Sequence, residues 1–337
     1  MAEYIKEKGF TIQSLASDPS PLLEGQVWYN TTSTVLKGYK AVLGTGAWSS
    51  GGALNTGRSD MGGSGTQTAT LAYFGSTGLG ISVAETYNGT SWTNTTSGTS
   101  TRHGGGSIGQ LQTDAAYVGG YSAPPPPLQS GKTEKWNGSA WTESGDLQSG
   151  RQGFYGGAGT TAAGLVAGSG PADGATETFN GTSWSEVNNL VTARQYAAVC
   201  GLTSTAAMVV GGYGIPADSP YSAGPGSRVG ITEIWDGTSW THVSGTLALG
   251  RIESALSGTS TDAVIAGGST GDPAPPTAPT ATAETWDGTS WTSVASMADG
   301  NEYPGSSSSS STAAISFGGW PGGSITASEE WTVPATT

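Results

Sequence analysis

The chain has 337 residues, of which only 11% are charged, and its 25 acidic and 12 basic side chains give a formal net charge of −13. This excess of acid disfavours a nucleic-acid partner, because phosphate binding depends on lysine and arginine. The single cysteine, Cys200, excludes an intrachain disulfide. We also expect no membrane partner, since no run approaches ~18 consecutive apolar residues, and no signal peptide, since residues 1–9 are charged and lack an apolar core.

Residues 1–40 are predicted to form an attachment arm that ends in a hairpin. Residues 1–23 contain the only moderately charged stretch of the chain and then the extended linker Asp18-Pro-Ser-Pro21. Further on, alternating apolar residues flank a polar turn at residues 30–34, which predicts a β-hairpin. Residues 24–48, with the elements Gly-Gln-Val-Trp-Tyr-Asn, Leu-Lys-Gly-Tyr and Trp48, resemble a short motif of tailed-bacteriophage virion proteins of the tail-fibre type.

A phrase of eight residues recurs five times in the rest of the chain. Its first copy reads Glu-Thr-Tyr-Asn-Gly-Thr-Ser-Trp and ends at Trp92, and the copies start at residues 85, 134, 177, 233 and 284. Each copy places Asn-Gly or Asp-Gly between two aromatic residues, which predicts a tight hairpin with a type I′ turn. The intervals of 43 to 56 residues are typical of β-propeller repeats.

The other parts of the repeat keep a constant order around this hairpin. An arginine stands ten or eleven residues after most of the repeat tryptophans, and a small-residue strand and an apolar strand that closes on Gly-Gly come next. Each unit is therefore predicted to have four strands. The order of apolar strand, Gly-Gly, aromatic residue and tryptophan resembles the kelch repeat, and this resemblance covers about residues 48 to 332.

The resemblance implies an all-β fold, a kelch-like β-propeller over residues 41–337. Counting the apolar strands predicts six blades. Trp48 lies in the last strand of a repeat unit whose first strands are missing. Trp331 lies in the first arm of a hairpin whose second arm is missing. The two terminal fragments are complementary, so we expect the Trp48 strand to pair with the Trp331 strand and to close the ring without an open edge.

Two interpretations of the repeat arginines are open. A ring of guanidinium groups could bind an anionic ligand; it would comprise Arg58, Arg102, Arg151, Arg194 and Arg251. Alternatively, each arginine is structural and pairs with a carboxylate or with carbonyl groups of an adjacent blade, and the repeat glutamates are the obvious partners. The repeat tryptophans are interpreted as packing between blades; these are Trp48, Trp92, Trp141, Trp184, Trp240 and Trp291.

Ligand contacts are expected on the face from which the long loops at 121–132, 213–230 and 269–282 rise. The candidates on these and the equivalent last loop are Tyr121, Tyr213, Tyr221 and Trp320. No catalytic residue, metal site or cofactor is predicted, since two histidines and one cysteine do not make a copper site and no carboxylates are paired in the sequence.

We therefore expect a non-enzymatic structural or adhesin protein of a tailed phage: a tail-fibre, tail-associated or capsid-decoration component. It would assemble in the host cytoplasm, join other virion proteins in multiple copies through residues 1–40, and bind a host-surface glycan or protein with its propeller. The alternatives are a cellular kelch-type interaction module and, third, a sugar oxidase or glycan hydrolase.

Overall fold

The structure, a computed structural model, describes residues 12–19, 26–38, 45–122, 128–169, 173–214, 227–270, 279–307, 309–320 and 325–334. The chain divides into two compact units, Met1–Thr45 with Val333–Thr337, and Gly46–Thr332. The second unit starts a few residues later than the predicted boundary at residue 41, next to the first strand of the repeat sheets. Within the described ranges, no helix has the length and apolar character needed to cross a bilayer.

The first unit contains one three-stranded sheet. Strand β2 (Val27–Asn30) pairs antiparallel with β3 (Val35–Gly38) across a turn at residues 31–34, which confirms the predicted hairpin. Strand β1 (Gln13–Leu15) adds to β2 in parallel. This strand was not predicted, because three residues with one apolar side chain carry no periodic signal.

Asp18 holds this hairpin together, although the sequence suggested only a linker there. Its carboxylate accepts hydrogen bonds from Trp28 Nε1 (3.0 Å) and Asn30 Nδ2 (2.8 Å) and pairs with Lys37 Nζ at 2.8 Å. The hydrogen bond from Lys37, followed by those from Asn30 and Trp28, lowers the pKa of Asp18.

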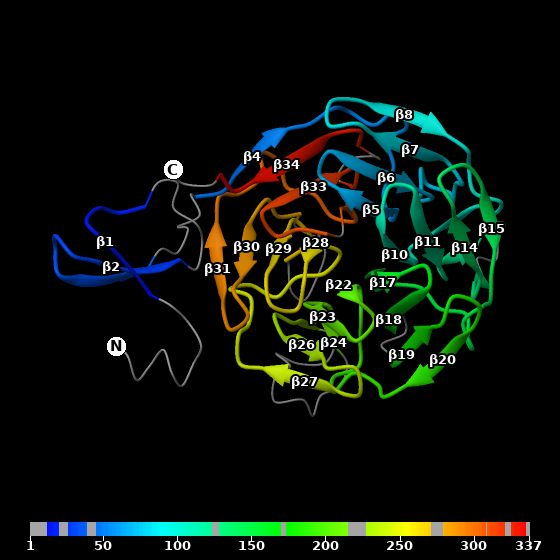
Figure 1. Ribbon diagram of the computed structural model, residues 1–337. Coiled ribbons are helices and arrows are strands. Elements are labelled where there is room, and N and C mark those ends of the chain that lie inside the picture. Colours follow the sequence, from blue (N-terminus) through cyan, green and yellow to red (C-terminus); the bar gives the residue numbers. More distant parts are fainter. Residues whose placement is uncertain are drawn as a thin grey trace. The chain divides into compact units, whose positions relative to one another are not determined.

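The second unit is built from antiparallel sheets that stand side by side around a common centre (Figure 1). Most contain four strands in chain order, as predicted for the repeat. The first is β5 (Gly62–Thr66), β6 (Ala69–Tyr73), β7 (Ala84–Tyr87) and β8 (Trp92–Thr95). The next is β10 (Gly106–Leu111), β11 (Asp114–Val118), β14 (Thr133–Trp136) and β15 (Trp141–Glu143). It is followed by β17 (Ala158–Thr160), β18 (Ala163–Ser169), β19 (Asp173–Phe179) and β20 (Trp184–Val187).

The chain continues through two more sheets of this kind. One consists of β22 (Ala197–Thr203), β23 (Ala206–Val210), β26 (Thr232–Trp235) and β27 (Trp240–Val243), with β16 (Phe154–Gly156) added in parallel to β22. The other consists of β28 (Ala255–Gly258), β29 (Ala263–Ala266), β30 (Ala283–Trp286) and β31 (Trp291–Val294).

The last sheet joins the two ends of the unit. Its strands are β32 (Gly305–Ser306), β33 (Ala313–Phe317), β34 (Ser328–Thr332) and β4 (Ala47–Ser50). Trp331 lies opposite Trp48 in the antiparallel pair of β34 and β4, with ring centroids 5.4 Å apart. The predicted pairing of the Trp48 strand with the Trp331 strand is thereby confirmed.

The repeated hairpins exist, but the prediction of a type I′ turn was wrong. Tyr87 pairs directly with Trp92, so the loop has four residues. Gly89 has a positive φ of 88°, whereas Asn88 does not belong to the residues with positive φ. Instead, Asn88 Oδ1 accepts hydrogen bonds from the backbone N–H groups of Thr90 and Ser91 at 3.0 and 2.9 Å. The asparagine therefore acts as a side-chain cap of the turn.

Additional short strands lie between the repeat sheets and the loops that follow Gly-Gly. They form the sheets β13-β12-β9 and β21-β24-β25. Their bounds are β9 (Arg102–His103), β12 (Tyr121–Ser122), β13 (Leu128–Gln129), β21 (Arg194–Gln195), β24 (Tyr213–Gly214) and β25 (Ser227–Arg228).

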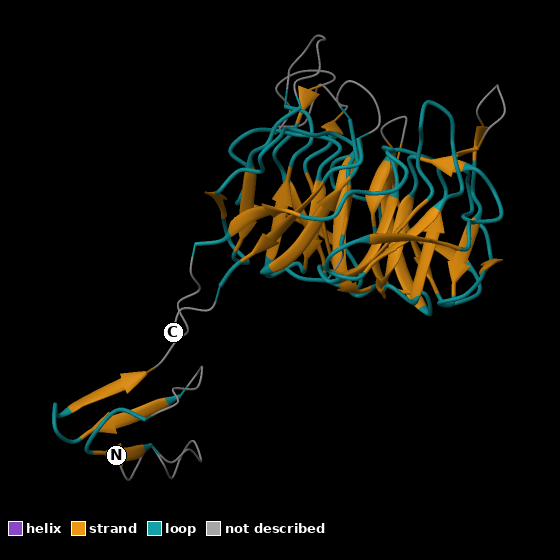
Figure 2. Ribbon diagram, turned by 90° about the horizontal axis from the view of Figure 1, so that it is seen from above, coloured by secondary structure: helices purple, strands orange, loops and turns teal. Residues whose placement is uncertain are grey.

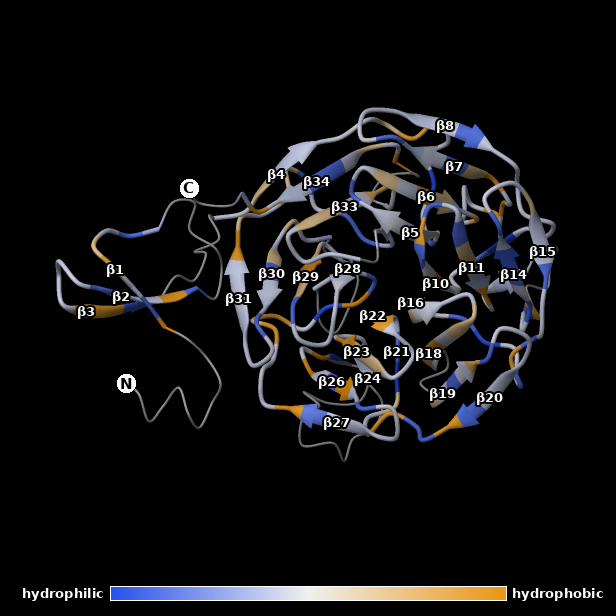
Figure 3. Cartoon of the chain, viewed as in Figure 1, coloured by the Kyte–Doolittle hydropathy of each residue, from blue (hydrophilic) through white to orange (hydrophobic). Residues whose placement is uncertain are grey.

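The core lies between neighbouring sheets and is filled by the middle strands and the aromatic hairpin arms. One cluster joins Leu165, Val199 and Val209 to the ring of Trp240, so it spans two sheets. The outermost strands, such as β8, β20 and β27, are coloured hydrophilic in Figure 3. Figure 2 shows that the strands run between two faces covered by loops. Because adjacent strands are antiparallel, the loops after Gly-Gly and the Asn-Gly turns lie on opposite faces.

Candidate functional site

Five repeat arginines form buried ion pairs with the glutamate on the third strand of the repeat sheet that begins after each arginine, and not with an adjacent sheet as expected. The N–O distances include 3.0 Å for Arg102–Glu134 and 2.7 Å for Arg251–Glu284. Every one of these side chains is at most 4% exposed; the pairs are Arg58–Glu85, Arg102–Glu134, Arg151–Glu177, Arg194–Glu233 and Arg251–Glu284.

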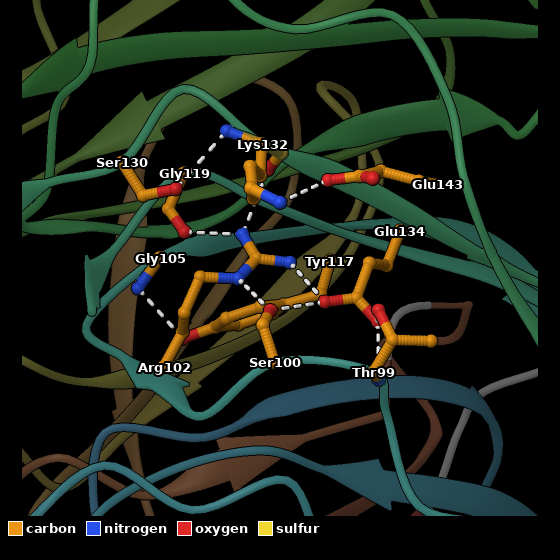
Figure 4. Close-up of polar contacts among 10 residues, drawn as sticks. All are labelled: Thr99, Ser100, Arg102, Gly105, Tyr117, Gly119, Ser130, Lys132, Glu134 and Glu143. Atoms are coloured by element: carbon orange, nitrogen blue, oxygen red, sulfur yellow. Dashed lines mark hydrogen bonds and ion pairs between the residues drawn. The ribbon is translucent and has the colours of Figure 1, made fainter. Parts of the chain in front are cut away.

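The surroundings of Arg102 explain how a guanidinium is held inside the protein (Figure 4). Its Nη1 donates to the carbonyl oxygens of Gly119 and Lys132 at 2.6 and 2.7 Å, and its Nε donates to Ser100 Oγ at 3.0 Å. Glu134 accepts a further hydrogen bond from the Thr99 N–H at 2.6 Å. Burial opposes ionisation of Glu134, but the hydrogen bonds and the charge of Arg102 outweigh it and lower its pKa.

This geometry favours the structural interpretation of the repeat arginines. Arg102 and Arg194 are 0% exposed and Arg151 is 4% exposed. Their donors are directed at carboxylates and carbonyl groups of their own sheet. An anionic ligand at the surface therefore cannot reach the guanidinium groups of Arg102, Arg151 and Arg194, since each is buried and ion-paired.

The residues two positions after the five repeat arginines, and after Asn301 in the equivalent position of the last repeat, lie around the axis of the sheets. Each has a φ between 55° and 75°, the left-handed region; they are Asp60, Gly104, Gly153, Tyr196, Glu253 and Tyr303. Their backbones are linked by six hydrogen bonds of 2.6 to 3.0 Å, each from the N–H of one residue to the carbonyl of the residue before it in the ring. Asp60 N–H donates to the carbonyl of Tyr303, so the series of hydrogen bonds returns to its first residue. We call these six residues the axial ring.

The side chains at the axial ring combine carboxylates and tyrosines. Tyr155 donates a hydrogen bond of 2.8 Å to Asp60 Oδ1, and its ring centroid lies 6.1 Å from that of Tyr303 and 6.4 Å from that of Tyr196. Glu253 accepts a hydrogen bond from Tyr303. Asp60, Tyr196 and Tyr303 are half-buried, whereas Tyr155 and Glu253 are buried.

Burial dominates the electrostatics of this cluster. It raises the pKa of Asp60 and raises the pKa of Glu253 well above its usual range, and the neighbouring negative charge of Asp60 adds to the effect on Glu253. Glu253 Oε2 has no hydrogen-bond partner among the described residues. Below the ring, a cavity of about 20 Å³ lined by residues of the inner strands has room for about one water. This cavity is too small for a sugar, so the mouth of the axis is the part that we consider for a ligand.

The predicted contact residues surround the same mouth as far as the structure describes them. Tyr121 pairs with His103 in β12 and β9, with ring centroids 5.7 Å apart. Tyr213 pairs with Gln195 in the equivalent position, and Trp320 forms a bridge with Glu302. Trp320 is the most exposed of these side chains, at 43%. Tyr221 and the proline-rich parts of the three long loops lie outside the described residues.

The repeat tryptophans lie between the sheets. Trp92, Trp141, Trp184 and Trp240 are buried, while Trp48 and Trp291 are half-buried and pack against core clusters. Among the residues that the structure describes, no group of three or more histidine, cysteine, aspartate or glutamate side chains is arranged to hold a metal ion.

The sequence analysis missed the tyrosines and carboxylates of the axial ring. These residues differ from repeat to repeat, so no motif marks them. A signal exists only after alignment on the arginine, because the position two residues later holds Asp60, Tyr196, Glu253 and Tyr303 in four of the six repeats.

Comparison with known proteins supports the fold and no more. No protein-family model matches the chain, and no curated protein matches it. Among solved structures, the one described as "Structure of YjhT", which has a β-propeller-type fold, matches with a TM-score of 0.66 and 14% identity, over 85% of this chain and 99% of its own. Together with the all-β repeat sheets, this similarity assigns the chain to the β-propeller type of fold.

Proposed function

We propose that the second unit is a closed, six-bladed, kelch-like β-propeller. Three contacts support closure: the axial ring of six hydrogen bonds, the pairing of Trp331 with Trp48, and the contacts of Gln67. Gln67 Nε2 donates to the Trp331 carbonyl at 2.8 Å, as Gln112 Nε2 donates to the Tyr87 carbonyl at 2.7 Å. The same contact thus joins the first and last sheets as well as consecutive ones.

On this scaffold, the protein serves as a non-enzymatic virion component of a tailed phage. Residues 1–40 attach it to other virion proteins, and the face around the axial ring binds a glycan on the host surface. The resemblance of residues 24–48 to tail-fibre-type proteins supports the first part. The second part depends on one observation, the gathering of Tyr155, Tyr196 and Tyr303 with two carboxylates at the mouth of the axis.

This chemistry suits a neutral sugar. Tyrosine rings offer apolar faces to a sugar ring, and carboxylates accept hydrogen bonds from sugar hydroxyls. The ion-paired arginines cannot attract an acidic sugar. The left-handed backbone of the axial ring holds the side chains of consecutive sheets in fixed positions, so little conformational entropy is lost on binding.

Binding of the purified protein to host cells and to a panel of neutral glycans tests this proposal. We expect Tyr196→Ala and Tyr303→Ala to weaken binding by at least about tenfold while each protein remains folded. Thr90→Ala, in an exposed turn on the opposite face, is the control and should bind like the parent. Equal binding by all three variants would place recognition elsewhere.

One alternative has an observation in its favour. Two carboxyl groups with raised pKa values beside tyrosines also suit a glycan hydrolase, in which a protonated carboxyl acts as the acid. Release of reducing sugar from a bound glycan, abolished by Glu253→Gln, would establish that activity. The other alternative, a cellular kelch-type interaction module, predicts that an antibody to this protein labels no phage particles in electron micrographs.

A further inference from the structure

One sheet lacks the repeat arginine. In the sheet β32-β33-β34-β4, Asn301 stands where the other sheets have arginine. Its backbone occupies the equivalent place, because Gly268 N–H donates to the Asn301 carbonyl at 2.6 Å as Gly212 N–H donates to the Arg251 carbonyl at 2.8 Å. Its shorter side chain reaches one carbonyl, that of Gly318, at 3.3 Å.

The glutamate that would receive this arginine is still present. Glu329 Oε2 accepts a hydrogen bond from Ala298 N–H at 2.8 Å, as Glu284 Oε2 accepts one from Ala248 N–H at 2.9 Å. In the complete pair, the second oxygen of Glu284 binds Arg251 at 2.7 Å. The second oxygen of Glu329, Oε1, has no hydrogen-bond partner within the described part of the chain.

A cavity of about 600 Å³ lies beside this oxygen. Its lining includes Asn301, Ser316, Ala327 and Glu329, and it extends to the exposed residue Asp299 at the surface. Asn301 and Ser316 are only 8% and 2% exposed. Asn301 Oδ1 and Ser316 Oγ are nevertheless without a hydrogen-bond partner among the described residues. Among the described residues that line the cavity, none is a lysine, an arginine or a histidine.

The polar groups of the cavity are mostly hydrogen-bond acceptors. In the sheet of β28 to β31, the Thr282 carbonyl accepts from both Gly267 N–H and Arg251 Nη1, at 3.2 and 2.9 Å. The equivalent Ala327 carbonyl accepts from Gly318 N–H at 2.9 Å, and among described residues no guanidinium approaches it. The cavity thus offers a carboxylate, a carbonyl and two unpartnered oxygens. Such a set of acceptors suits a planar cation with several N–H donors. A guanidinium group has this shape, and an ammonium group does not.

We propose that this cavity binds a guanidinium group carried by a ligand, either an arginine side chain of a partner protein or a small guanidine. The ligand takes the place of the missing repeat arginine and pairs with Glu329. Five copies of the same pair elsewhere in the chain show the geometry that the bound group would adopt. The inference does not depend on the proposed virion function.

Binding of millimolar methylguanidinium to the full chain, measured by ligand-observed NMR, tests this site. We expect saturable binding that Glu329→Gln weakens by at least about tenfold, because one charged hydrogen-bonded pair is lost. Glu330→Gln is the matched control, since it removes the same charge from the neighbouring residue of β34 and should bind like the parent. Methylammonium and methylurea, which lack the charged fork, should bind more weakly.

A second variant tests the same idea from inside the chain. Asn301→Arg supplies the guanidinium in place of the ligand, so it should abolish methylguanidinium binding and raise the thermal midpoint. The proposal would be overturned if methylguanidinium did not bind the parent chain, or if the Glu329 and Glu330 variants lost binding equally. Both outcomes can be measured even if Asn301→Arg does not fold. A blocked peptide with a central arginine distinguishes the two sources: its binding indicates a partner protein, and binding of methylguanidinium alone indicates a small guanidine.

Discussion

In five of the six repeat sheets, a buried Arg–Glu pair links several strands through a single arginine side chain. Arg102 donates to the carbonyl groups of Gly119 and Lys132 and pairs with the carboxylate of Glu134. The loss of one partner from such a pair typically costs about 3–5 kcal/mol, because the other charge stays buried. Glu329 differs from the glutamates of these pairs, because it is half-exposed and keeps the hydrogen bond from Ala298 N–H, so it does not carry the full cost of a buried unpaired charge.

Glu253 should make stability depend on pH. Burial raises its pKa well above the ordinary glutamate value of 4.5, so the folded state binds more protons than the unfolded state above that pH. Its stabilising contribution is complete below pH 4.5 and is lost as the pH rises through the folded pKa. Asp60 and Glu302 oppose its ionisation, and Arg228 favours it.

We therefore expect Glu253→Gln to melt at a higher temperature than the parent near neutral pH. The difference should shrink as the pH falls below 4.5, where the parent carboxyl becomes protonated in the unfolded state as well. Thermal melts across this range measure it. A constant difference at all pH values would show that Glu253 titrates normally in the folded protein.

The strand β4 illustrates how an element can be short and polar and still be essential. Most of its residues are exposed, yet the strand pairs with β34 over four residues and places Trp48 against Trp331. We expect Trp48→Ala to destabilise the second unit by about 2–3 kcal/mol, less than a fully buried tryptophan because Trp48 is half-buried. Trp320→Ala, at a more exposed tryptophan outside the repeat, should leave the melt nearly unchanged. Equal melting of the two variants would mean that β4 contributes little to the fold.

At the scale of the whole molecule, the proposed function assigns attachment and recognition to different units. The two units are each compact, and the first has its own polar network around Asp18. A chain that lacks residues 1–40 should keep the thermal midpoint of the second unit, because those residues contribute none of its strands. On the proposed function, the same chain should fail to join phage particles, as measured by blotting of purified virions. Normal incorporation would place the attachment surface in the second unit.

The repeat and its strand order could be derived from the amino-acid sequence, and so could the Trp48–Trp331 pairing. These features follow from local chemistry that recurs: alternating apolar residues, Gly-Gly at strand ends, and Asn-Gly or Asp-Gly between aromatic residues. The glutamate partners of the arginines could also be named, because both residues keep a fixed place in the repeat. The turn type could not be derived from the sequence, since Asn88 can either adopt a positive φ or cap the turn with its side chain.

The proposed binding face and the cavity became visible only when the sheets were placed in space. Asp60, Tyr155 and Tyr303 are far apart in the chain and share no motif, and they meet because each precedes or begins the innermost strand of its own sheet. The cavity beside Asn301 likewise results from one substitution and the geometry around it. Asparagine at this position is an ordinary variation in a sequence, and it leaves an unpaired carboxylate only because Glu329 on β34 is held where an arginine would reach it.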